Sequence, residues 1–400
     1  FKEAFYIAGT GRPGPVLIDI PMDVQKAVIN FEYPEKCEIR SYKPTTKGNY
    51  VQVRRVMAAL EEAEKPLICI GGGVFAAHAE NEIRELADLM QIPVITTMMG
   101  ISVFPDDDQL FCGMIGTHGV KMANAAVNEC DVLFLVGARV GDRAVKTPLA
   151  LEKTTKIIHI DIDPAEIGKN IGADLPLVGD AKLVLQQMTE LAKPMKHDEW
   201  IAHIKTLGGE RKYVEPAKGT VNPRVFIDRL AKKMPANVTV VADVGQNQIW
   251  TCTEYKFRKE GRLLTSGGMG TMGYSVPAAI GAKMADNSRA TVAICGDGAF
   301  QMSFMELATA VQFGVDIKVV VMTNNRLGMV RELQTNGYHD RQTAVFLDGS
   351  PDFIKLAEAY GIPAMRVYDD DTMDKGVEML AEHKGICLVE VVVDKDMPTL

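Results

Sequence analysis

Short runs of apolar, often β-branched residues alternate with amphipathic stretches along most of the chain. Uninterrupted apolar runs are typical of strands that are buried on both faces, and stretches with a period of 3.6 residues are typical of helices that cover such a sheet. The pattern therefore predicts an α/β protein with doubly wound parallel sheets. It occurs in two successive blocks, which predicts tandem domains at residues 50–193 and 221–400.

The first block has four predicted helices, at 51–64, 79–90, 120–129 and 181–192. Its predicted strands are 66–71, 92–97, 132–136 and 156–161. In the second block, helices are predicted at 224–233, 303–313 and 353–360, and strands at 238–242, 291–295, 317–323 and 386–393. Stretches without sustained periodicity at 26–49 and 194–220 are predicted to be linkers.

Residues 1–25 lie before the two blocks and contain few predicted elements. They predict one helix at 2–8, a glycine and proline turn at 11–15 and a buried strand at 16–20. One helix and one strand cannot enclose a hydrophobic core of their own. Because the sequence also begins without Met, we expect these residues to be the end of a domain whose larger part precedes them.

Composition excludes several classes of protein. Hydrophobic residues make up 47% and charged residues 24% of the chain, as in ordinary folded proteins. The net charge of −8 predicts no attraction to nucleic acid or to anionic membrane surfaces. No apolar run approaches the ~20 residues of a membrane-spanning helix. The seven cysteines are scattered, which predicts reduced thiols in a cytoplasmic compartment.

Two predicted strands of the second block end in polar motifs. Gly296-Asp297-Gly298 follows one strand, and Asn324-Asn325 follows the next. The carboxyl ends of parallel strands share one edge of a sheet, so the two motifs are expected to converge there. A carboxylate and an amide oxygen suit Mg²⁺ bridged to a diphosphate, and the glycines let the backbone approach phosphate groups. Each motif alone is more often a turn or a helix cap, but the pair favours such a site.

The two motifs together resemble the thiamine diphosphate signature of the 2-oxo-acid decarboxylase superfamily. The surrounding sequence is similar, more narrowly, to acetolactate synthase, also called acetohydroxyacid synthase. The segments that carry this resemblance are 11–16, 160–170, 244–248, 265–274, 328–330 and 352–357. The resemblance extends over essentially all 400 residues and implies a thiamine diphosphate-binding fold behind a central Rossmann-like domain.

The resemblance implies roles for residues of the second block. It assigns the metal ion to Asp297, Asn325 and the carbonyl oxygen of Leu327. It places Met272 under the thiazolium ring and Met329 in the substrate pocket, and assigns Gln246 to the same catalytic group. The remaining residues that it assigns to the diphosphate cofactor are Gly245, Gln248, Gly270, Gly296, Gly298 and Gly328. Judged by residue type alone, a core methionine or a polar turn is the commoner role.

The resemblance also implies FAD in the first block. The residues that it assigns to the flavin are Gly71, Gly72, Gly116, His118, Arg139 and Asp161. The reaction needs no redox step, so this flavin would be structural. From the motif alone, the glycine run at 71–73 is more simply a turn between a strand and a helix. The segment 137–143 also departs from the family pattern, which commonly has Phe-Asp where this chain has Val140-Gly141.

The activity implied is the decarboxylation of pyruvate and its condensation with a second pyruvate or with 2-oxobutyrate, the first common step of branched-chain amino acid biosynthesis. The implied partners are further copies, in a homodimer or homotetramer, and a small regulatory subunit. Residues 1–25 would be the end of the pyrimidine-binding domain, which carries the activating Glu, so the chain by itself is expected to be inactive.

Two kinds of alternative remain open at this point. One is another thiamine diphosphate enzyme of 2-oxo acids, such as a pyruvate oxidase, a glyoxylate carboligase or a simple decarboxylase. The other is a non-catalytic nucleotide-binding or interaction protein, in which the glycine turns only shape the fold.

Overall fold

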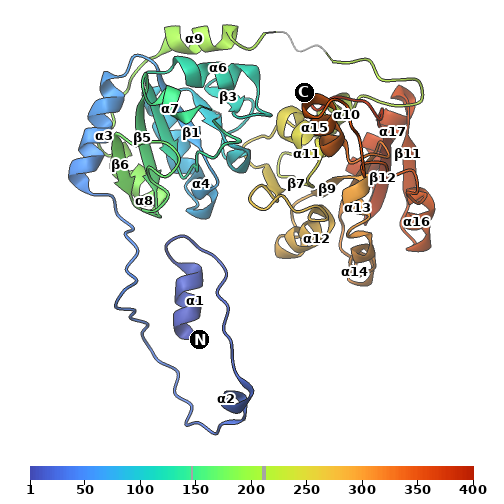
Figure 1. Cartoon of the computed structure of the whole chain (residues 1–400), viewed down its shortest axis with the longest axis horizontal. Helices are drawn as coiled ribbons and strands as arrows, with labels where there is room; N and C mark the ends of the chain where they lie inside the picture. Colours follow the sequence, from blue (N-terminus) through green and yellow to red (C-terminus); the bar gives the residue numbers. More distant parts are fainter. Residues whose placement is uncertain (146, 210–212) are drawn as a thin grey trace. The chain divides into compact units, whose positions relative to one another are not determined.

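The computed structural model describes residues 1–145, 147–209 and 213–400. By their internal contacts these residues group into two compact units, one formed by 1–95 with 126–203 and the other by 96–125 with 204–400. Two six-stranded sheets flanked by helices organise the chain (Figure 1). The predicted α/β class, with doubly wound parallel sheets in tandem, is confirmed.

The first sheet has the strand order β3-β2-β1-β4-β5-β6. Its strands are β1 (Pro66–Ile70), β2 (Val94–Thr96), β3 (Phe111–Met114), β4 (Val132–Val136), β5 (Lys156–Asp161) and β6 (Leu175–Val178). The pairs β1 with β4, β4 with β5 and β5 with β6 are parallel. Every residue of β1 and β4 is buried, as expected for central strands that are covered on both faces.

Seven helices accompany this sheet along the chain: α3 (Tyr50–Glu62), α4 (Gly73–Ala76), α5 (Glu80–Met90), α6 (Lys121–Glu129), α7 (Pro148–Leu151), α8 (Ala181–Thr189) and α9 (Asp198–Thr206). A short 3-10 turn, η1 (Met98–Gly100), follows β2. Side-chain caps define two of the helix starts. Asn49 accepts the first N–H groups of α3, and Asp180 accepts the N–H of Leu183 in α8.

The second sheet has the order β11-β12-β10-β9-β7-β8. Its strands are β7 (Thr239–Ala242), β8 (Arg262–Thr265), β9 (Thr291–Gly296), β10 (Lys318–Thr323), β11 (Ala364–Val367) and β12 (Cys387–Val392). All five neighbouring pairs are parallel. The chain adds β8 on one side of β7 and then continues from β9 on the other side. The strand order therefore reverses between β7 and β9, where α/β sheets leave a crevice for ligands.

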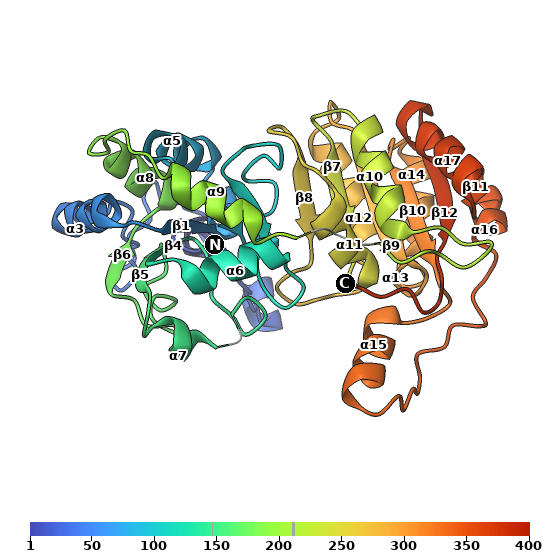
Figure 2. The same cartoon turned by 90° about the horizontal axis from the view of Figure 1, so that it is seen from above.

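The helices of the second unit are α10 (Pro223–Lys233), α11 (Gln246–Glu254), α12 (Ser275–Ala285), α13 (Asp297–Phe300), α14 (Leu307–Gln312), α15 (Gly328–Gly337), α16 (Phe353–Ala359) and α17 (Asp370–Glu382), with a 3-10 turn η2 (Phe304–Glu306). Successive strand residues pack into different cores: Val240 and Val320 join one apolar cluster, whereas Val241 and Val321 join the other. Helix α15 and the loop after it extend away from the sheet (Figure 2).

One predicted element is wrong. The buried strand expected at 16–20 is absent, and its side chains are exposed, with Leu17 at 89%. No described strand lies beside this segment, and an isolated strand has no partner for its backbone hydrogen bonds. The helix expected at 2–8 is present as α1 (Lys2–Gly9), and a short helix α2 (Met22–Lys26) follows the segment.

Several elements were not predicted. Helix α9 lies in the stretch 194–220, where the pattern predicts only a linker. The pattern also gives no signal for β3, β6, β8, β11, α11, α12, α15 and α17, and the helix expected at 303–313 is divided into η2 and α14. No helix of the described residues has the length and apolar character needed to cross a membrane. The seven cysteines are all free thiols.

Candidate functional site

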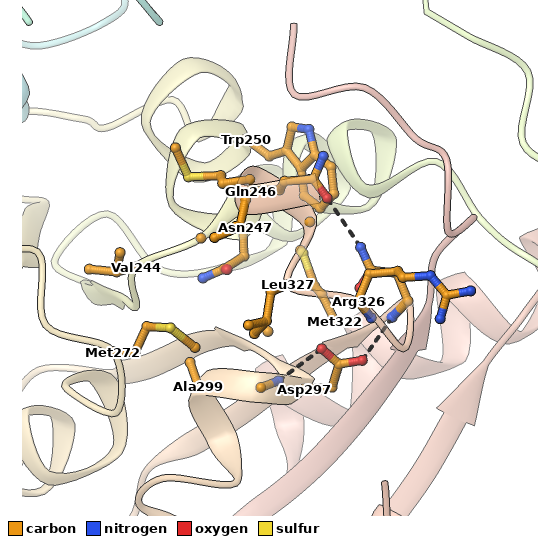
Figure 3. Close-up of a pocket in the computed structure, with 17 residues that line it drawn as sticks. Val244, Gln246, Asn247, Trp250, Met272, Asp297, Ala299, Met322, Arg326 and Leu327 are labelled. Carbon is orange, nitrogen blue, oxygen red and sulfur yellow. Dashed lines mark hydrogen bonds between the residues drawn. The ribbon is translucent and has the colours of Figure 1, made fainter. Parts of the chain in front are cut away.

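A pocket of about 100 Å³ lies at the carboxyl edge of the second sheet (Figure 3). Its lining comes from the residues after β7, from the turn between β9 and α13, and from the loop between β10 and α15. The strands β7 and β9 are the two between which the strand order reverses. The pocket therefore occupies the position where the topology of the sheet predicts a ligand site.

Asp297 joins the two motifs that the sequence suggested as a pair. Its side chain is only 1% exposed. Its Oδ1 accepts the N–H of Gly298 at 2.8 Å, and its Oδ2 accepts the N–H groups of Asn324 at 3.2 Å and Asn325 at 2.6 Å. The carboxylate at the end of β9 thus holds the loop that follows β10, and the two motifs are adjacent as the strand-edge argument predicts.

Burial raises the pKa of Asp297 to about 6, although its backbone hydrogen bonds act in the opposite direction. The negative charge is thus only partly compensated by the three N–H groups. A carboxylate in this position is stabilised further by any cation that reaches it. No group of three or more His, Cys, Asp or Glu side chains suited to a metal ion occurs in the described part of the chain. A cation here would combine one carboxylate with amide and carbonyl oxygens, which suits Mg²⁺.

The two asparagines of the second motif lie differently. Asn324 lines the pocket, whereas Asn325 is exposed and is not part of the lining. Asn325 has a left-handed backbone with φ of +54°, which turns the chain at this point. The Nδ2 of Asn324 donates to Gln246 Oε1 at 3.1 Å, and its Oδ1 accepts the N–H of Arg326 at 3.0 Å. Of the two amides, the geometry favours that of Asn324 as a ligand in the pocket.

The carbonyl groups of the same loop also differ. The Leu327 oxygen, expected as a metal ligand, accepts the N–H of Arg331 at 2.9 Å in the first turn of α15. In the described residues, the Arg326 carbonyl oxygen accepts no hydrogen bond. The Arg326 guanidinium points away from the pocket (Figure 3) and bonds Asp348 at 3.0 Å. Arg326 can therefore serve the pocket through its backbone rather than through its charge.

Gln246 is 4% exposed and connects the pocket with the segment after β12. Its Nε2 donates to the Met397 carbonyl at 2.9 Å and to Thr399 Oγ1 at 3.2 Å. Since its Oε1 accepts from Asn324, the amide of Gln246 fixes the orientation of the amide of Asn324. A Cβ on Gly328 would lie 1.9 Å from Gln246 Oε1, so any side chain at this position requires the Gln246 amide to move from its hydrogen bonds.

The apolar walls of the pocket are formed by Met272, Leu327, Met329 and neighbouring residues. A Cβ on Gly298 would lie 2.7 Å from Leu327 Cδ2 and 3.5 Å from Met272 Cε, so this glycine leaves room for both side chains. Gly245 and Gly296 also line the pocket. Met272 comes from the glycine-rich loop before α12 and therefore reaches the pocket from a different segment than Leu327 and Met329.

Two of the expected cofactor residues lie outside the lining. Gln248 is buried in α11 and donates from Nε2 to Thr265 Oγ1 at 2.6 Å, at the end of β8. Gly270 is exposed in the loop before Met272, with φ of +67°. Neither residue contributes to the pocket in this structure.

Four residues around the pocket have no role assigned from the sequence. Asn324 and Arg326 line the pocket, whereas the resemblance assigns the metal ion to their neighbours Asn325 and Leu327. Trp250 lines the pocket from α11. Asp243, at the end of β7, is fully buried. A carboxylate directly after an apolar strand, as at Asp297, is the signal that could have identified Asp243.

The residues expected to bind flavin in the first unit follow strand ends of the first sheet. Gly71 and Gly72 follow β1, Arg139 follows β4, and Asp161 ends β5. These strands are parallel neighbours, so the four residues share one edge. A Cβ on Gly71 would lie 2.1 Å from the Gly137 carbonyl oxygen. Close packing of two loops thus requires this glycine, whether or not a ligand is bound.

Asp161 and Arg139 differ in their surroundings. Asp161 is half-buried, and its Oδ1 accepts the N–H of Asp163 at 2.9 Å. Burial raises the pKa of Asp161 above its usual value. Arg139 is exposed. Gly116 and half-buried His118 follow β3, in the segment 96–125 that groups with the second unit. The side chain of Asn124 holds the peptide of Gly116 through two hydrogen bonds of 2.9 Å.

Comparison with known proteins accounts for both sheets. Residues 243–391 match the C-terminal TPP-binding domain of thiamine pyrophosphate enzymes, and residues 53–188 match the central domain of the same enzymes. The chain is 41% identical to the probable acetolactate synthase large subunit of Methanocaldococcus jannaschii, over 98% of this chain and 69% of that protein. The chain belongs to the acetolactate synthase large-subunit family.

Two bacterial relatives agree with this assignment. The chain is 38% identical to the acetolactate synthase large subunit of Buchnera aphidicola over 94% of this chain and 67% of that protein. It is 41% identical to the acetolactate synthase large subunit of Corynebacterium glutamicum over 91% of this chain and 60% of that protein. The chain thus spans 60% to 69% of the length of the three relatives. The resemblance to this enzyme family is confirmed.

Gly328→Ala is expected to destabilise the second unit by about 1–3 kcal/mol, because its Cβ must displace Gln246 or the start of α15. Gly281→Ala in α12 is the matched control, since no atom lies within 4 Å of its Cβ and alanine favours a helix. Denaturant unfolding followed by the fluorescence of Trp250, in a Trp200→Phe background, measures both changes. Equal effects of the two substitutions would contradict the packing of Gly328 against Gln246.

The raised pKa of Asp297 predicts a pH-dependent stability difference between the wild type and Asp297→Asn. Below about pH 4 the carboxyl group is protonated in both the folded and the unfolded state. As the pH rises to about 7, the folded wild type must ionise a buried group, so its stability falls relative to the variant by an amount on the order of 3 kcal/mol. Trp250 fluorescence in urea, measured across this range, checks the trend. A difference that stays constant with pH would show that burial does not raise the pKa.

Proposed function

We propose that this protein acts as the catalytic large subunit of an acetolactate synthase. It would decarboxylate pyruvate and join the two-carbon product to a second pyruvate or to 2-oxobutyrate. The observation that carries the proposal is the buried Asp297 carboxylate, which holds the loop of the second motif at a pocket whose other walls are mainly apolar. The membership of the chain in the acetolactate synthase family supports the choice of reaction.

The residues around the pocket fit a divalent cation and a diphosphate. The proposed cation ligands are the Asp297 carboxylate, the Asn324 amide oxygen and the Arg326 carbonyl oxygen, all from residues of the pocket lining. This set replaces Asn325 and Leu327 by their neighbours. Oxygen donors of this kind, completed by phosphate oxygens, are typical of Mg²⁺ sites. The deep burial of Asp297 favours such a partner because, among the described residues, backbone N–H groups alone offset its charge.

Thiamine diphosphate, when bound, supplies the carbanion equivalent that no protein side chain provides. The chain itself orients the cofactor and excludes water. Met272 and Leu327 offer apolar surface for its rings, while Gly296 and Gly298 keep the backbone beside Asp297 free of side chains. Met329, at the start of α15, is the proposed contact for the 2-oxo acid substrate.

The lining of the pocket contains one carboxylate, Asp297, and one cationic side chain, Arg326. Asp297 is engaged with the loop after β10, and the Arg326 guanidinium bonds Asp348. Neither group is therefore placed to move a proton at the cofactor. We propose that a carboxylate outside this lining, from a second subunit, completes the site. This implies a homodimer or homotetramer, and a small regulatory subunit is a further proposed partner in the cytoplasm.

The cation site is tested by Asn324→Ala and Asn325→Gly in the full-length protein. Asn324→Ala removes the proposed ligand and should weaken Mg²⁺-dependent binding of thiamine diphosphate at least about tenfold. Asn325→Gly is the matched control, because glycine retains the left-handed backbone and the N–H bond to Asp297. Calorimetric titration of thiamine diphosphate with Mg²⁺ measures both affinities. If Asn325→Gly lowers this affinity and Asn324→Ala does not, Asn325 is the metal ligand and the proposal for Asn324 is wrong.

Product analysis with pyruvate tests the reaction in the same preparations. Acetolactate is the expected product, and 2-oxobutyrate as the second substrate should give the acetohydroxybutyrate analogue. Peroxide would indicate a pyruvate oxidase, and free aldehyde a simple decarboxylase. Binding of the cofactor without any of these products would contradict the proposed reaction but not the cofactor site.

We also propose that the first unit holds FAD as a structural group. The support is the half-buried Asp161 at the carboxyl end of β5, because ligands of α/β sheets bind at this edge and a carboxylate there can accept ribose hydroxyl groups. Gly72 and Arg139 share that edge of the sheet, and Gly71 lets the two loops pack closely. The flavin takes no part in the transfer of carbon units.

The flavin proposal predicts that Asp161→Asn lowers the affinity for FAD about tenfold, because one acceptor of a ribose hydroxyl becomes a donor. Asp174→Asn is the matched control, since Asp174 also accepts a backbone N–H, that of Ile157 at 2.8 Å near the start of β5. Quenching of flavin fluorescence upon titration measures the affinity. Equal affinities for the two variants would remove Asp161 from the site, and absence of flavin binding in the wild type would contradict the proposal.

A further inference from the structure

Asp243 is a second buried carboxylate at the carboxyl edge of the second sheet. It follows β7, has no exposed surface, and takes no part in the cation site described above. Its Oδ1 accepts the N–H of Val244 at 2.8 Å and of Gly273 at 3.0 Å, and its Oδ2 accepts the N–H of Ser275 at 2.7 Å. Three backbone N–H groups from two segments thus surround one carboxylate, and hydrogen bonds to a charged acceptor are the stronger kind.

The two segments form different walls of the pocket. Val244 begins the segment that leads into α11, and Gly273 directly follows Met272. Ser275 is the first residue of α12, so Asp243 also satisfies an N–H group that has no partner inside that helix. The carbonyl of Asp243 accepts from Asn247 Nδ2 at 2.8 Å, which holds its backbone in place.

The loop before Met272 has few other anchors. Residues 267–271 are exposed, and the side chain of Met269 is 92% exposed. Within this loop, Gly270 and Thr271 donate only to Ser266, which belongs to the same loop. The first connection from the loop back to the sheet is the bond between Gly273 and Asp243. The position of Met272 in the pocket therefore depends on the Asp243 carboxylate together with the packing of Met272 against the apolar cluster that contains Val241.

We infer that Asp243 is a positioning residue, which fixes Met272 against the pocket and sets its separation from the wall formed by Val244 and Gln246. Its effect on turnover rests on the proposed function, because Met272 is expected to contact the rings of the cofactor. The carboxylate of Asp243 bonds only backbone N–H groups and none of the proposed cation ligands, so its loss should change the reaction more than it changes the binding of the diphosphate.

Asp243→Asn tests this inference because it retains the shape of the side chain but only one acceptor oxygen. The amide NH₂ must then face either Ser275 or the pair of N–H groups from Val244 and Gly273, and two donors repel each other. In the full-length protein, kcat for acetolactate should fall at least about tenfold, while the Kd for thiamine diphosphate with Mg²⁺ stays within about threefold.

A double-mutant cycle separates positioning from a general loss of structure. If Asp243 acts through Met272, Asp243→Asn should lower kcat by no more than about twofold in a Met272→Ala background. The control Asp352→Asn also removes a carboxylate that accepts two backbone N–H groups, but at the start of α16, and should leave kcat unchanged. Additive losses in the cycle would overturn the inference, as would wild-type kcat in Asp243→Asn.

Hydrogen exchange gives a result that does not depend on turnover. In Asp243→Asn, the amides of Gly273 and Ser275 should exchange at least about tenfold faster, with little change in β10. Unchanged protection of both amides would overturn the inference. If Asp243→Asn does not fold, Asp243→Glu retains the charge with a longer side chain, and wild-type kcat in that variant would equally overturn it. If Asp243→Asn shows the expected faster exchange but the wild type forms no acetolactate, the proposed function is refuted and the positioning role of Asp243 is not.

Discussion

The arrangement of the second unit depends on one buried charge. Asp297 is almost fully enclosed, and the cost of removing an ionised carboxylate from water is met only in part by the three backbone N–H groups that it accepts. Two of these N–H groups belong to the loop after β10, so the same bonds that stabilise the charge also place Asn324 and Arg326 at the pocket. The incomplete compensation is what makes a cation at this carboxylate favourable.

A buried carboxylate follows each of the two neighbouring strands β7 and β9, and each one holds a different loop. Asp243 after β7 and Asp297 after β9 both accept N–H groups from their own next residue and from a distant loop. The strand order reverses between β7 and β9, so no crossover helix fills the space between the two turns. One carboxylate organises the wall that carries Met272, and the other organises the wall that carries Leu327. The pocket is the space that remains between two loops, each held by a buried anion.

The sequence predicts those parts of the fold that have a clear periodicity. Strands such as β9 and β10 are buried throughout and were found from their apolar runs. Helix α11 was missed because its sequence is polar, although all nine of its residues are buried. The strand expected at 16–20 has the right composition but no partner. For the second motif, residue types alone do not distinguish Asn324 from Asn325; the structure adds that Asn324 lines the pocket and that Asn325 has a left-handed backbone.

The first sheet shows why a glycine motif and a ligand site are separate questions. Gly71 and Gly73 approach the backbone of Gly137 so closely that any side chain would collide, which explains these glycines without a flavin. Asp161 is different, because packing does not require a carboxylate at the end of β5, and burial there disfavours its charge. It accepts one backbone N–H through Oδ1, which leaves acceptor capacity on both oxygens. Hydroxyl donors of a ribose would satisfy that capacity without requiring a cation. Each sheet thus has a carboxylate at a strand end with unused acceptor capacity, but the two carboxylates suit different ligands.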